Sequence, residues 1–465
     1  MSQEPSTEFD QVLKNPDLWD CFKDDEGLSP LGYGNPHFLY GVATSMYQDS
    51  GAMHCPDSQW KEWESKKSLS HLKSGKSVNL LELYQNNPLE IVQRLELLGV
   101  NAYRFSIEWS HIEPTCGRYN LKNVKIYVNF CKILRDHDIE PLITLHHFSE
   151  PTWFHQKGSF EKEENIAYFL KFSSLVFEQL IENYQGKPLV EYFFTINEPG
   201  VEAFNRYLLG NFSPNLMWRF KRGARFLLNM MKAHSQVYSA LKSIALKQKK
   251  TIRIGITHQY LKFYSTHWFM SPFAKCLNVY MEAILRFFET GEFLCKVPFL
   301  CHIAQDFHGS KKPKTDFVGV QFYGRVFVGL KGLDAKNKPC TTMPGMHEDP
   351  EGLFEAITTI YNAFKVPVLI SENGISTSCD LQRDRYLSRA LYAAEKARQK
   401  IGAENMLGYI LWSFTDNFEW QLGWGPQFGA FSVDNGCIQG NYKPGVQVYV
   451  DTIRNWKSYS LNTKE

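Results

Sequence analysis

The stretch VEYFFTINEPG, from Val190 to Gly200, begins as a β-strand and ends in residues that no strand favours. Its first half carries the β-branched and aromatic side chains typical of strands. Asn197 and Glu198 are poor strand residues, and Pro199 has no backbone N–H to donate to a neighbouring strand. The strand is therefore predicted to stop at an amide and a carboxylate.

A second stretch, VPVLISENG from Val366 to Gly374, is built in the same way. An apolar strand is predicted first, followed by Glu372 and then by Asn373 and a glycine. Each of these two strands is predicted to be buried and to place a carboxylate at its C-terminal end.

Short apolar runs of this kind recur along the whole chain and alternate with segments that have helical spacing of apolar residues. The predicted strands are 38–43, 102–107, 141–145, 191–196, 252–256, 317–322, 366–370 and 408–412. Eight strands that alternate with helices, without a repeat or an obvious linker, predict an α/β fold with a single (β/α)8 TIM barrel. A doubly wound sheet is the competing interpretation, but neither G-x-G-x-x-G nor G-x-x-x-x-G-K-[ST] follows a strand.

The C-terminal ends of the strands form the active-site face of such a barrel. Glu198 and Glu372 are therefore predicted to face one another across its mouth. Two carboxylates that face each other across a pocket, without metal ligands or a nucleotide-binding loop, are the catalytic groups that glycoside hydrolysis requires. At a separation of ~5–5.5 Å the second carboxylate is a nucleophile, whereas at ~6.5–9.5 Å it activates water, and the sequence leaves this distance open.

Composition and charge exclude several classes of protein. The chain has 465 residues and a net charge of +2, which gives no electrostatic reason to expect nucleic acid or an anionic membrane as a partner. Its apolar windows are broken well short of the ~18 residues that span a bilayer. The ten cysteines form neither a C-x-x-C pair nor an ordered Cys/His spacing, and the polar N-terminus lacks the features of a signal peptide. We therefore expect a cytoplasmic enzyme without a metal or cofactor, and the oligomeric state stays open.

Six blocks of the sequence, in order, resemble glycoside hydrolase family 1, the retaining β-glycosidases, from about Phe38 to about Tyr449. VLISENGIS is similar to the nucleophile motif of the family, and TINEP is similar to its acid/base motif. The other blocks are YRFSIEWSHIEP, TLHHFSEPTWF, DFVGVQFYG and WSFTDNFEWQLGWGPQFGAFSVD. The sequences of these blocks are more similar to those of archaeal β-glycosidases than to those of secreted plant β-glucosidases. In the last third of the chain they are also similar to a plant galactolipid-remodelling branch.

The resemblance implies that Glu372 is the nucleophile and Glu198 the general acid/base. Arg104 and the Tyr323 hydroxyl would keep the nucleophile ionised, whereas burial and the charge of Glu372 would keep Glu198 protonated. Asn197 would bond the sugar 2-hydroxyl. The full set implied for substrate binding is Gln48, His147, Asn197, Trp412, Glu419, Trp420 and Phe428. The implied activity is hydrolysis of a small β-glucoside or β-galactoside through a covalent glycosyl-enzyme.

Departures from the family pattern keep other functions open. Gly200 stands where many members carry Trp, which predicts an open leaving-group side. Gln321 replaces a usual Asn and is expected to add a methylene beside the nucleophile. The alternative activity is a transglycosylase that passes the glycosyl unit to a sugar or glycolipid hydroxyl, and a non-catalytic sugar-binding protein is the third possibility. Residues 1–36 are predicted as an N-terminal extension of unknown role, and 37–465 as the catalytic barrel.

Overall fold

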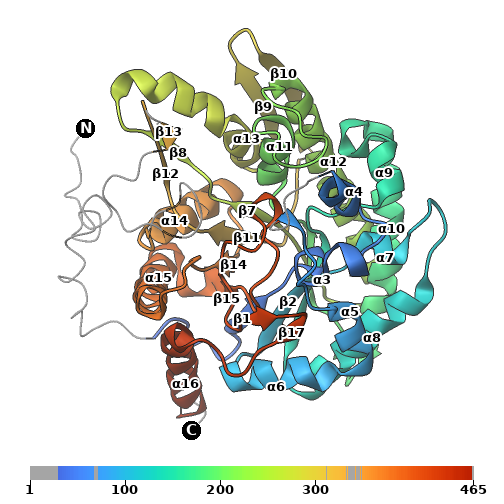
Figure 1. The fold of residues 1–465 in the computed structure, drawn as a ribbon, viewed down its shortest axis with the longest axis vertical. Helices are drawn as coiled ribbons and strands as arrows, with labels where there is room; N and C mark the ends of the chain where they lie inside the picture. Colours follow the sequence, from blue (N-terminus) through green and yellow to red (C-terminus); the bar gives the residue numbers. More distant parts are fainter. Residues whose placement is uncertain are drawn as a thin grey trace.

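The computed structural model describes residues 30–66, 72–309, 312–330, 332–333, 341, 346 and 348–462. Eight parallel strands at its centre form a closed barrel in the order β1-β15-β14-β11-β7-β6-β3-β2, and helices surround them (Figure 1). The strands are β1 (Leu39–Ala43), β2 (Ala102–Ser106), β3 (Glu140–His146), β6 (Tyr192–Ile196), β7 (Arg253–Gln259), β11 (Phe317–Phe322), β14 (Val368–Asn373) and β15 (Met406–Trp412). The predicted (β/α)8 TIM barrel is confirmed.

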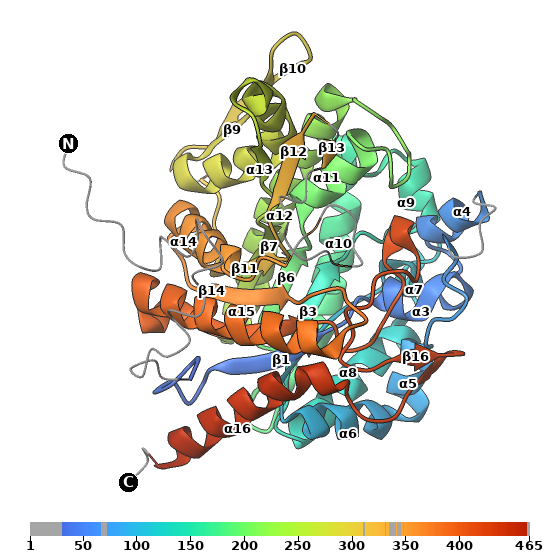
Figure 2. The same ribbon diagram turned by 60° about the vertical axis from the view of Figure 1, so that its left-hand side comes forward.

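The helices around the barrel are amphipathic and begin and end where the sequence signals it. Helix α6 starts with Pro88, buries Ile91, Leu95 and Leu98 along one face, and stops at Gly99, whose φ is 73°. The long helices are α6 (Pro88–Leu98), α8 (Leu121–Asp136), α10 (Ile166–Leu180), α12 (Phe220–Lys247), α13 (Ser271–Thr290), α14 (Gly352–Phe364), α15 (Asp380–Ile401) and α16 (Gln447–Asn462). Helix α16 packs beside α15 (Figure 2). Within the described ranges, no helix combines the length and the apolar character that crossing a membrane requires.

The interior of the barrel is a packed core of its own. It holds aliphatic and aromatic side chains from several strands, among them Leu39, Ala102, Leu142, Phe194, Phe317, Leu369 and Ile410, with Trp412 and Phe428 in the same cluster. Because this interior is filled, the barrel has no pore, and pockets form only outside the core, at the two ends of the barrel.

Two strands run three residues beyond their predicted C-terminal ends, and the others end within one residue of the prediction. Strand β7 runs on to Gln259, three residues beyond the predicted end. Strand β14 contains Glu372, so the prediction that the strand stops before this residue is wrong. The reason is a bulge: Val320 of β11 pairs with Ile370, but the next residue, Gln321, pairs with Glu372. The extra residue, Ser371, lets β14 stay paired with β11 beyond the bulge and changes the direction of the Glu372 side chain.

Short additional elements are inserted between the barrel strands and the helices. Strands β8 (Phe263–Ser265), β12 (Val326–Gly329) and β13 (Gly332–Leu333) form a small sheet. Strands β9 (Glu292–Val297) and β10 (Cys301–Asp306) form an antiparallel hairpin after α13. Helix α11 (Pro199–Tyr207) follows β6 directly.

The predicted N-terminal extension falls mostly on residues 1–29, which lie outside the described part of the chain. Just before β1, the backbone N–H of Gly32 donates to the Glu395 carboxylate (3.3 Å), and the Tyr33 ring lies edge-on to Tyr459 (5.4 Å). These contacts join the last residues of the predicted extension to α15 and α16. The boundary at residue 36 and the role of the extension stay predictions.

Candidate active site

The Glu198 carboxylate is positioned by an abrupt change from strand to helix. After β6, the Asn197 N–H still donates to the His146 carbonyl (2.8 Å), as a strand residue would. Glu198 then takes a left-handed conformation (φ 41°), and Pro199 opens helix α11 with the backbone angle that a first helical residue needs. The Glu198 N–H donates to the Thr257 hydroxyl (2.8 Å), which ties the turn to β7.

The Glu372 carboxylate is held by one cation and one hydroxyl. Its Oε1 pairs with the Arg104 guanidinium, and its Oε2 accepts a hydrogen bond from the Tyr323 hydroxyl (2.6 Å). Arg104 is itself fixed, because its Nη1 donates to the Ser371 carbonyl (3.2 Å) and its plane lies 4.8 Å from the Phe194 ring centre. Both lone-pair regions of the carboxylate are therefore oriented before any ligand binds.

The two carboxylates differ in how strongly their surroundings disfavour the charge. Burial and the neighbouring Glu372 charge raise the pKa of Glu198 well above its ordinary value, with Arg104 opposing them. Burial also raises the pKa of Glu372, but Arg104 and the Tyr323 hydrogen bond oppose that rise. The Oε1 atom of Glu198 is buried without a hydrogen-bond partner among the described residues. Of the two, Glu198 is the carboxyl that retains a proton to higher pH.

Asn197 is the hub of the polar groups beneath the pocket. Its Oδ1 accepts from Arg104 Nη2 (2.6 Å), Gln321 Nε2 (2.9 Å) and the Thr257 hydroxyl (3.1 Å). Its Nδ2 lies 3.2 Å from His147 Nε2. Gln321, which was expected to add a methylene beside the nucleophile, pairs with Glu372 across the two strands and donates its amide to Asn197.

One pocket collects most of the residues implied by the resemblance. Its lining includes Gln48, His147, Glu198, Tyr323, Glu372, Trp412, Glu419, Trp420 and Phe428. Arg104 and Asn197 do not line it and support the lining residues from below. The sequence interpretation missed further lining residues, namely Phe148, Val201, Asn205, Phe212, Gln259, Gln421 and Leu422. Gln259, a polar residue at the end of β7, carried the same strand-end signal as Glu198 and could have been found.

Aromatic rings and one acid form the wall opposite the two carboxylates. The His147 ring stacks on Trp412 (6.0 Å between centroids) and on Trp420 (6.4 Å). The Trp412 indole N–H donates to Glu419 (3.3 Å). Burial raises the pKa of Glu419 to about 8, although hydrogen bonds from Trp412 and Gln48 oppose the rise. The wall thus offers flat apolar faces next to donors and acceptors that a sugar ring can use.

Gly200 does not open the leaving-group side of this pocket, so that prediction is wrong. A Cβ at Gly200 would lie 2.6 Å from the Met281 sulfur and 3.0 Å from Cδ1 of Ile284, both on α13. The pocket-facing side of α11 carries Val201 and Asn205 instead, one helical turn apart. Gly200 is small because two helices cross closely there.

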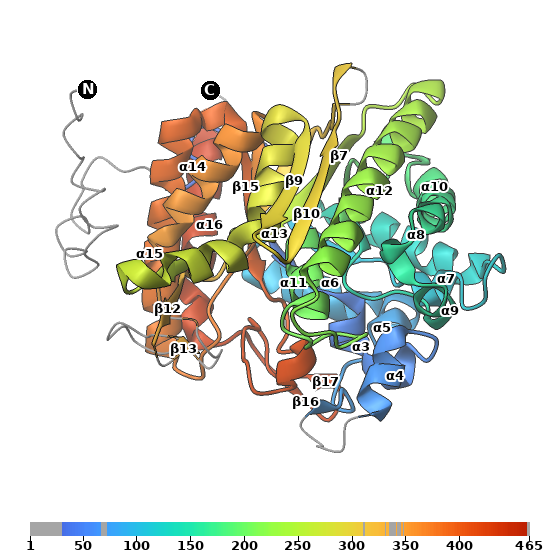
Figure 3. The same ribbon diagram turned by 90° about the horizontal axis from the view of Figure 1, so that it is seen from above.

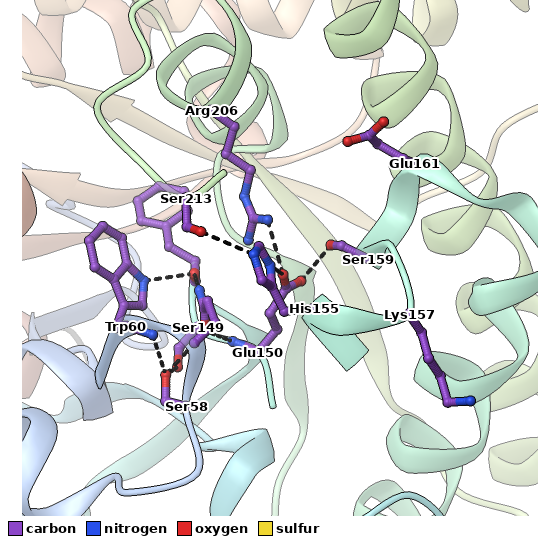
Figure 4. Close-up of polar contacts among 12 residues, drawn as sticks. Ser58, Trp60, Ser149, Glu150, His155, Lys157, Ser159, Glu161, Arg206 and Ser213 are labelled. Atoms are coloured by element: carbon purple, nitrogen blue, oxygen red, sulfur yellow. Dashed lines mark hydrogen bonds and ion pairs between the residues drawn. The ribbon is translucent and has the colours of Figure 1, made fainter. Parts of the chain in front are cut away.

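A buried charge network ties α11 to the loop that follows β3 (Figure 4). Arg206 places Nη1 3.0 Å from the Glu150 carboxylate and Nη2 2.7 Å from Glu202. His155 and Ser159 also bond Glu150 (2.7 and 2.6 Å). Although burial alone would raise the pKa of Glu150, the charges of Arg206 and His155 hold it well below its ordinary range. All three members of the Glu150–Arg206–Glu202 triad are buried.

We expect Arg206→Met to lower the free energy of unfolding by about 3–5 kcal/mol, because it removes the guanidinium shared by two buried carboxylates and leaves them with histidine partners alone. Arg222→Met is the matched control. Arg222 pairs with Glu161 at 2.8 Å, but its side chain is half exposed, so its loss should cost about 0–1 kcal/mol. Urea unfolding of both variants, followed by tryptophan fluorescence, checks the difference. Equal losses in the two variants would contradict a structural role for the triad.

A closed (β/α)8 barrel with two buried carboxylates and an indole-lined pocket at the C-terminal ends of its strands is the architecture of a glycoside hydrolase. Among the described residues, no group of three or more His, Cys, Asp or Glu side chains is arranged to hold a metal ion.

The chain belongs to glycosyl hydrolase family 1, whose sequence model matches residues 35–300 and 307–457. It is thus a glycosidase similar to β-glucosidases. β-Glucosidase A of Thermotoga maritima is 26% identical over 455 residues, which cover 90% of this chain and 97% of that protein. The solved β-glycosidase of Pyrococcus horikoshii is 28% identical, with a TM-score of 0.77 over 93% of this chain and 99% of that one.

A plant relative has a different activity in its name. The chloroplastic galactolipid galactosyltransferase of Arabidopsis thaliana is 27% identical over 377 residues. The match covers 76% of this chain but only 54% of the plant protein. The similarity therefore concerns part of that relative.

Proposed function

We propose that this protein is a retaining β-glycosidase that hydrolyses small β-glucosides or β-galactosides by double displacement. The observation that supports it best is the difference between the surroundings of the two carboxylates: Arg104 and Tyr323 bind Glu372, whereas burial beside a negative charge raises the pKa of Glu198. That asymmetry is what a nucleophile and a general acid require. A cytoplasmic setting is part of this proposal, because the ten scattered cysteines of the sequence do not form the pattern of a disulfide framework.

In the first step, a carboxylate oxygen of Glu372 attacks the anomeric carbon while Glu198 gives its proton to the departing glycosidic oxygen. The negative charge of Glu372 disappears into the new ester bond. Because that charge raises the pKa of Glu198, its loss lowers the pKa of Glu198 and prepares this residue to act as a base. In the second step, Glu198 takes a proton from water, whose oxygen bonds the anomeric carbon and releases Glu372.

Sugar recognition is assigned to the polar groups of the pocket wall. Gln48 and Glu419 line the pocket, and we assign them to ring hydroxyls, since Gln48 Oε1 is buried without a partner among the described residues. Trp412 supplies a flat face on which the sugar ring stacks. Asn197 lies directly beneath the pocket lining, with its Nδ2 directed towards His147, so its bond to the 2-hydroxyl, implied by the family resemblance, stays a prediction.

The anomer that forms first tests the retaining mechanism. When an aryl β-glucoside is hydrolysed in the NMR tube, we expect the β-anomer of the free sugar to appear before mutarotation produces the α-anomer, because two inversions restore the configuration. An aryl α-glucoside in a parallel tube should not react. Initial release of the α-anomer would reject double displacement.

A transglycosylase is the second candidate, favoured by the plant relative named as a galactosyltransferase. The pocket also has apolar walls next to Glu198, namely Val201 and Phe212, against which an apolar acceptor could pack instead of water. Products made with and without an added alkyl alcohol or galactolipid distinguish the two activities. A hydrolase releases free sugar in both mixtures, whereas a transferase forms the new glycoside in the second.

A further inference from the structure

Large apolar side chains are exposed on three segments at the active-site end of the barrel. Trp268 is 87% exposed and Trp218 is 50% exposed, although buried indoles are the rule elsewhere in the chain. The exposed apolar residues of these segments are Leu209, Met217, Trp218, Trp268, Phe269, Phe273, Phe299 and Leu300. One such residue alone would need no explanation, but a group of this size on neighbouring elements marks an interaction surface.

The three segments lie against one another. The Trp218 ring, just before α12, is 6.3 Å from Phe273 in the first turn of α13. The Tyr280 hydroxyl of α13 donates to the carbonyl of Phe220 (2.8 Å), which fixes the start of α12 on α13. The hairpin β9–β10, whose tip carries Phe299, packs on both helices (Figure 3).

The parts of these segments that carry the exposed apolar residues hold only positive charge, and the carboxylates Glu282, Glu292 and Asp306 lie directly beyond them in the sequence. Residues 208–230, 256–281 and 293–305 hold four, two and one Lys or Arg, respectively, and no Asp or Glu. Two of these cations are paired, Arg222 with Glu161 (2.8 Å) and Lys262 with Glu355 (3.4 Å). The others are Arg219, Lys221, Arg225, Lys275 and Lys296, all exposed and without an ion pair to another described residue. Together with the exposed apolar residues, these five form what we call the aromatic–basic surface.

This surface adjoins the entrance of the pocket through two connections. Phe212 lines the pocket, and Trp218 is six residues further along the same connection between α11 and α12. Gln259 lines the pocket at the end of β7, and the chain then leads through β8 to Trp268. A body that rests on the aromatic–basic surface would therefore sit beside the opening of the active site.

We propose that the aromatic–basic surface docks this enzyme on lipid bilayers that contain anionic headgroups. Tryptophan and phenylalanine side chains favour the headgroup level of a bilayer, and Lys and Arg are attracted by its negative surface potential. The net charge of +2 does not indicate the positive charge of this surface, because carboxylates elsewhere on the protein balance its cations. The inference goes beyond hydrolysis: it assigns a location to the enzyme whichever glycoside is its substrate.

Sedimentation with sucrose-loaded vesicles tests the proposal. We expect the wild-type chain to bind vesicles with about 30% phosphatidylglycerol, to bind pure phosphatidylcholine weakly, and to dissociate in high salt. A charge variant, Lys221→Gln with Arg225→Gln and Lys296→Gln, should bind roughly 30- to 100-fold more weakly. An aromatic variant, Trp218→Ser with Trp268→Ser, should also lose binding, by about tenfold or more.

The other end of α12 provides matched controls. Leu246 is 79% exposed there, and Lys247 and Lys249 are exposed beside it. Leu246→Ser, or Lys247→Gln with Lys249→Gln, should leave vesicle binding unchanged. Turnover of a soluble aryl glycoside without lipid should be equal in all these variants, so failure of the docking proposal can be told apart from failure of the proposed activity. The proposal is overturned if the wild-type protein does not bind anionic vesicles, or if it binds an acidic polypeptide such as polyglutamate but not the vesicles. Equal loss of vesicle binding in the control variants would also overturn it.

Discussion

Replacement of Glu372 by glycine should reduce kcat on the order of 10⁴- to 10⁶-fold, the scale of losing a catalytic nucleophile. Added formate or azide should then restore turnover, because the small anion occupies the vacated space beside Arg104 and attacks the anomeric carbon itself. A single displacement replaces the double one, so the glycosyl product that forms must have the α configuration. Rate measurements with an activated aryl β-glycoside and NMR of the product check both expectations.

The rescue needs a control for stability, since Glu372→Gly also removes the partner of a buried guanidinium. Glu395 offers a match, because it is buried and paired with Arg398 (2.7 Å) far from the pocket, on α15. Glu395→Gly should lower the melting temperature without a formate-dependent gain in rate. If rescued Glu372→Gly yields the β-product, Glu372 is not the nucleophile.

Replacement of Glu198 by alanine should slow substrates according to their leaving groups. Alkyl glycosides need a proton on the departing oxygen and should lose about 10²–10⁴-fold in kcat/KM, whereas dinitrophenyl glycosides, whose leaving group is stable as an anion, should lose much less in the first step. A series of aryl glycosides of graded phenol pKa measures this dependence. Equal losses across the series would remove Glu198 from the acid role.

The pH dependence of kcat/KM provides a second test of the acid role of Glu198. Hydrolysis requires protonated Glu198, and burial beside Glu372 raises its pKa, so the alkaline limb of kcat/KM should report its deprotonation. Glu419 could produce a similar limb, because burial raises its pKa to about 8. Glu419→Gln separates the two: it should keep the alkaline limb, whereas Glu198→Ala should lose it for substrates that still react.

The sequence by itself determined the barrel, because the signals that specify it are local. Each strand is a short apolar run, each helix has an apolar stripe, and their alternation leaves few ways to bury both. The two carboxylates, Glu198 after β6 and Glu372 near the end of β14, could be found for the same reason, since an amide or carboxylate that interrupts such a run must leave the sheet or face a site. The pair of carboxylates could therefore be predicted from local sequence patterns alone.

Only the tertiary structure decided where several of these side chains point. The bulge opposite Val320 keeps Glu372 inside its strand, and it depends on the pairing of two strands about 50 residues apart. Gly200 faces Met281 because α11 crosses α13, so its missing side chain leaves the pocket unchanged. Phe212 reaches the pocket from a connection without any regular pattern, and nothing local announces that.

The distribution of charge depended on the tertiary structure most of all. Net charge is a sum over the chain, and a sum of +2 gave no reason to expect an anionic partner. Folding places three segments without carboxylates side by side, so that cations such as Lys221 and Lys296, 75 positions apart in the printed sequence, share one surface. Electrostatic attraction falls with distance in space and is screened within about 10 Å, so position in the fold, and not position in the sequence, decides which charges act together.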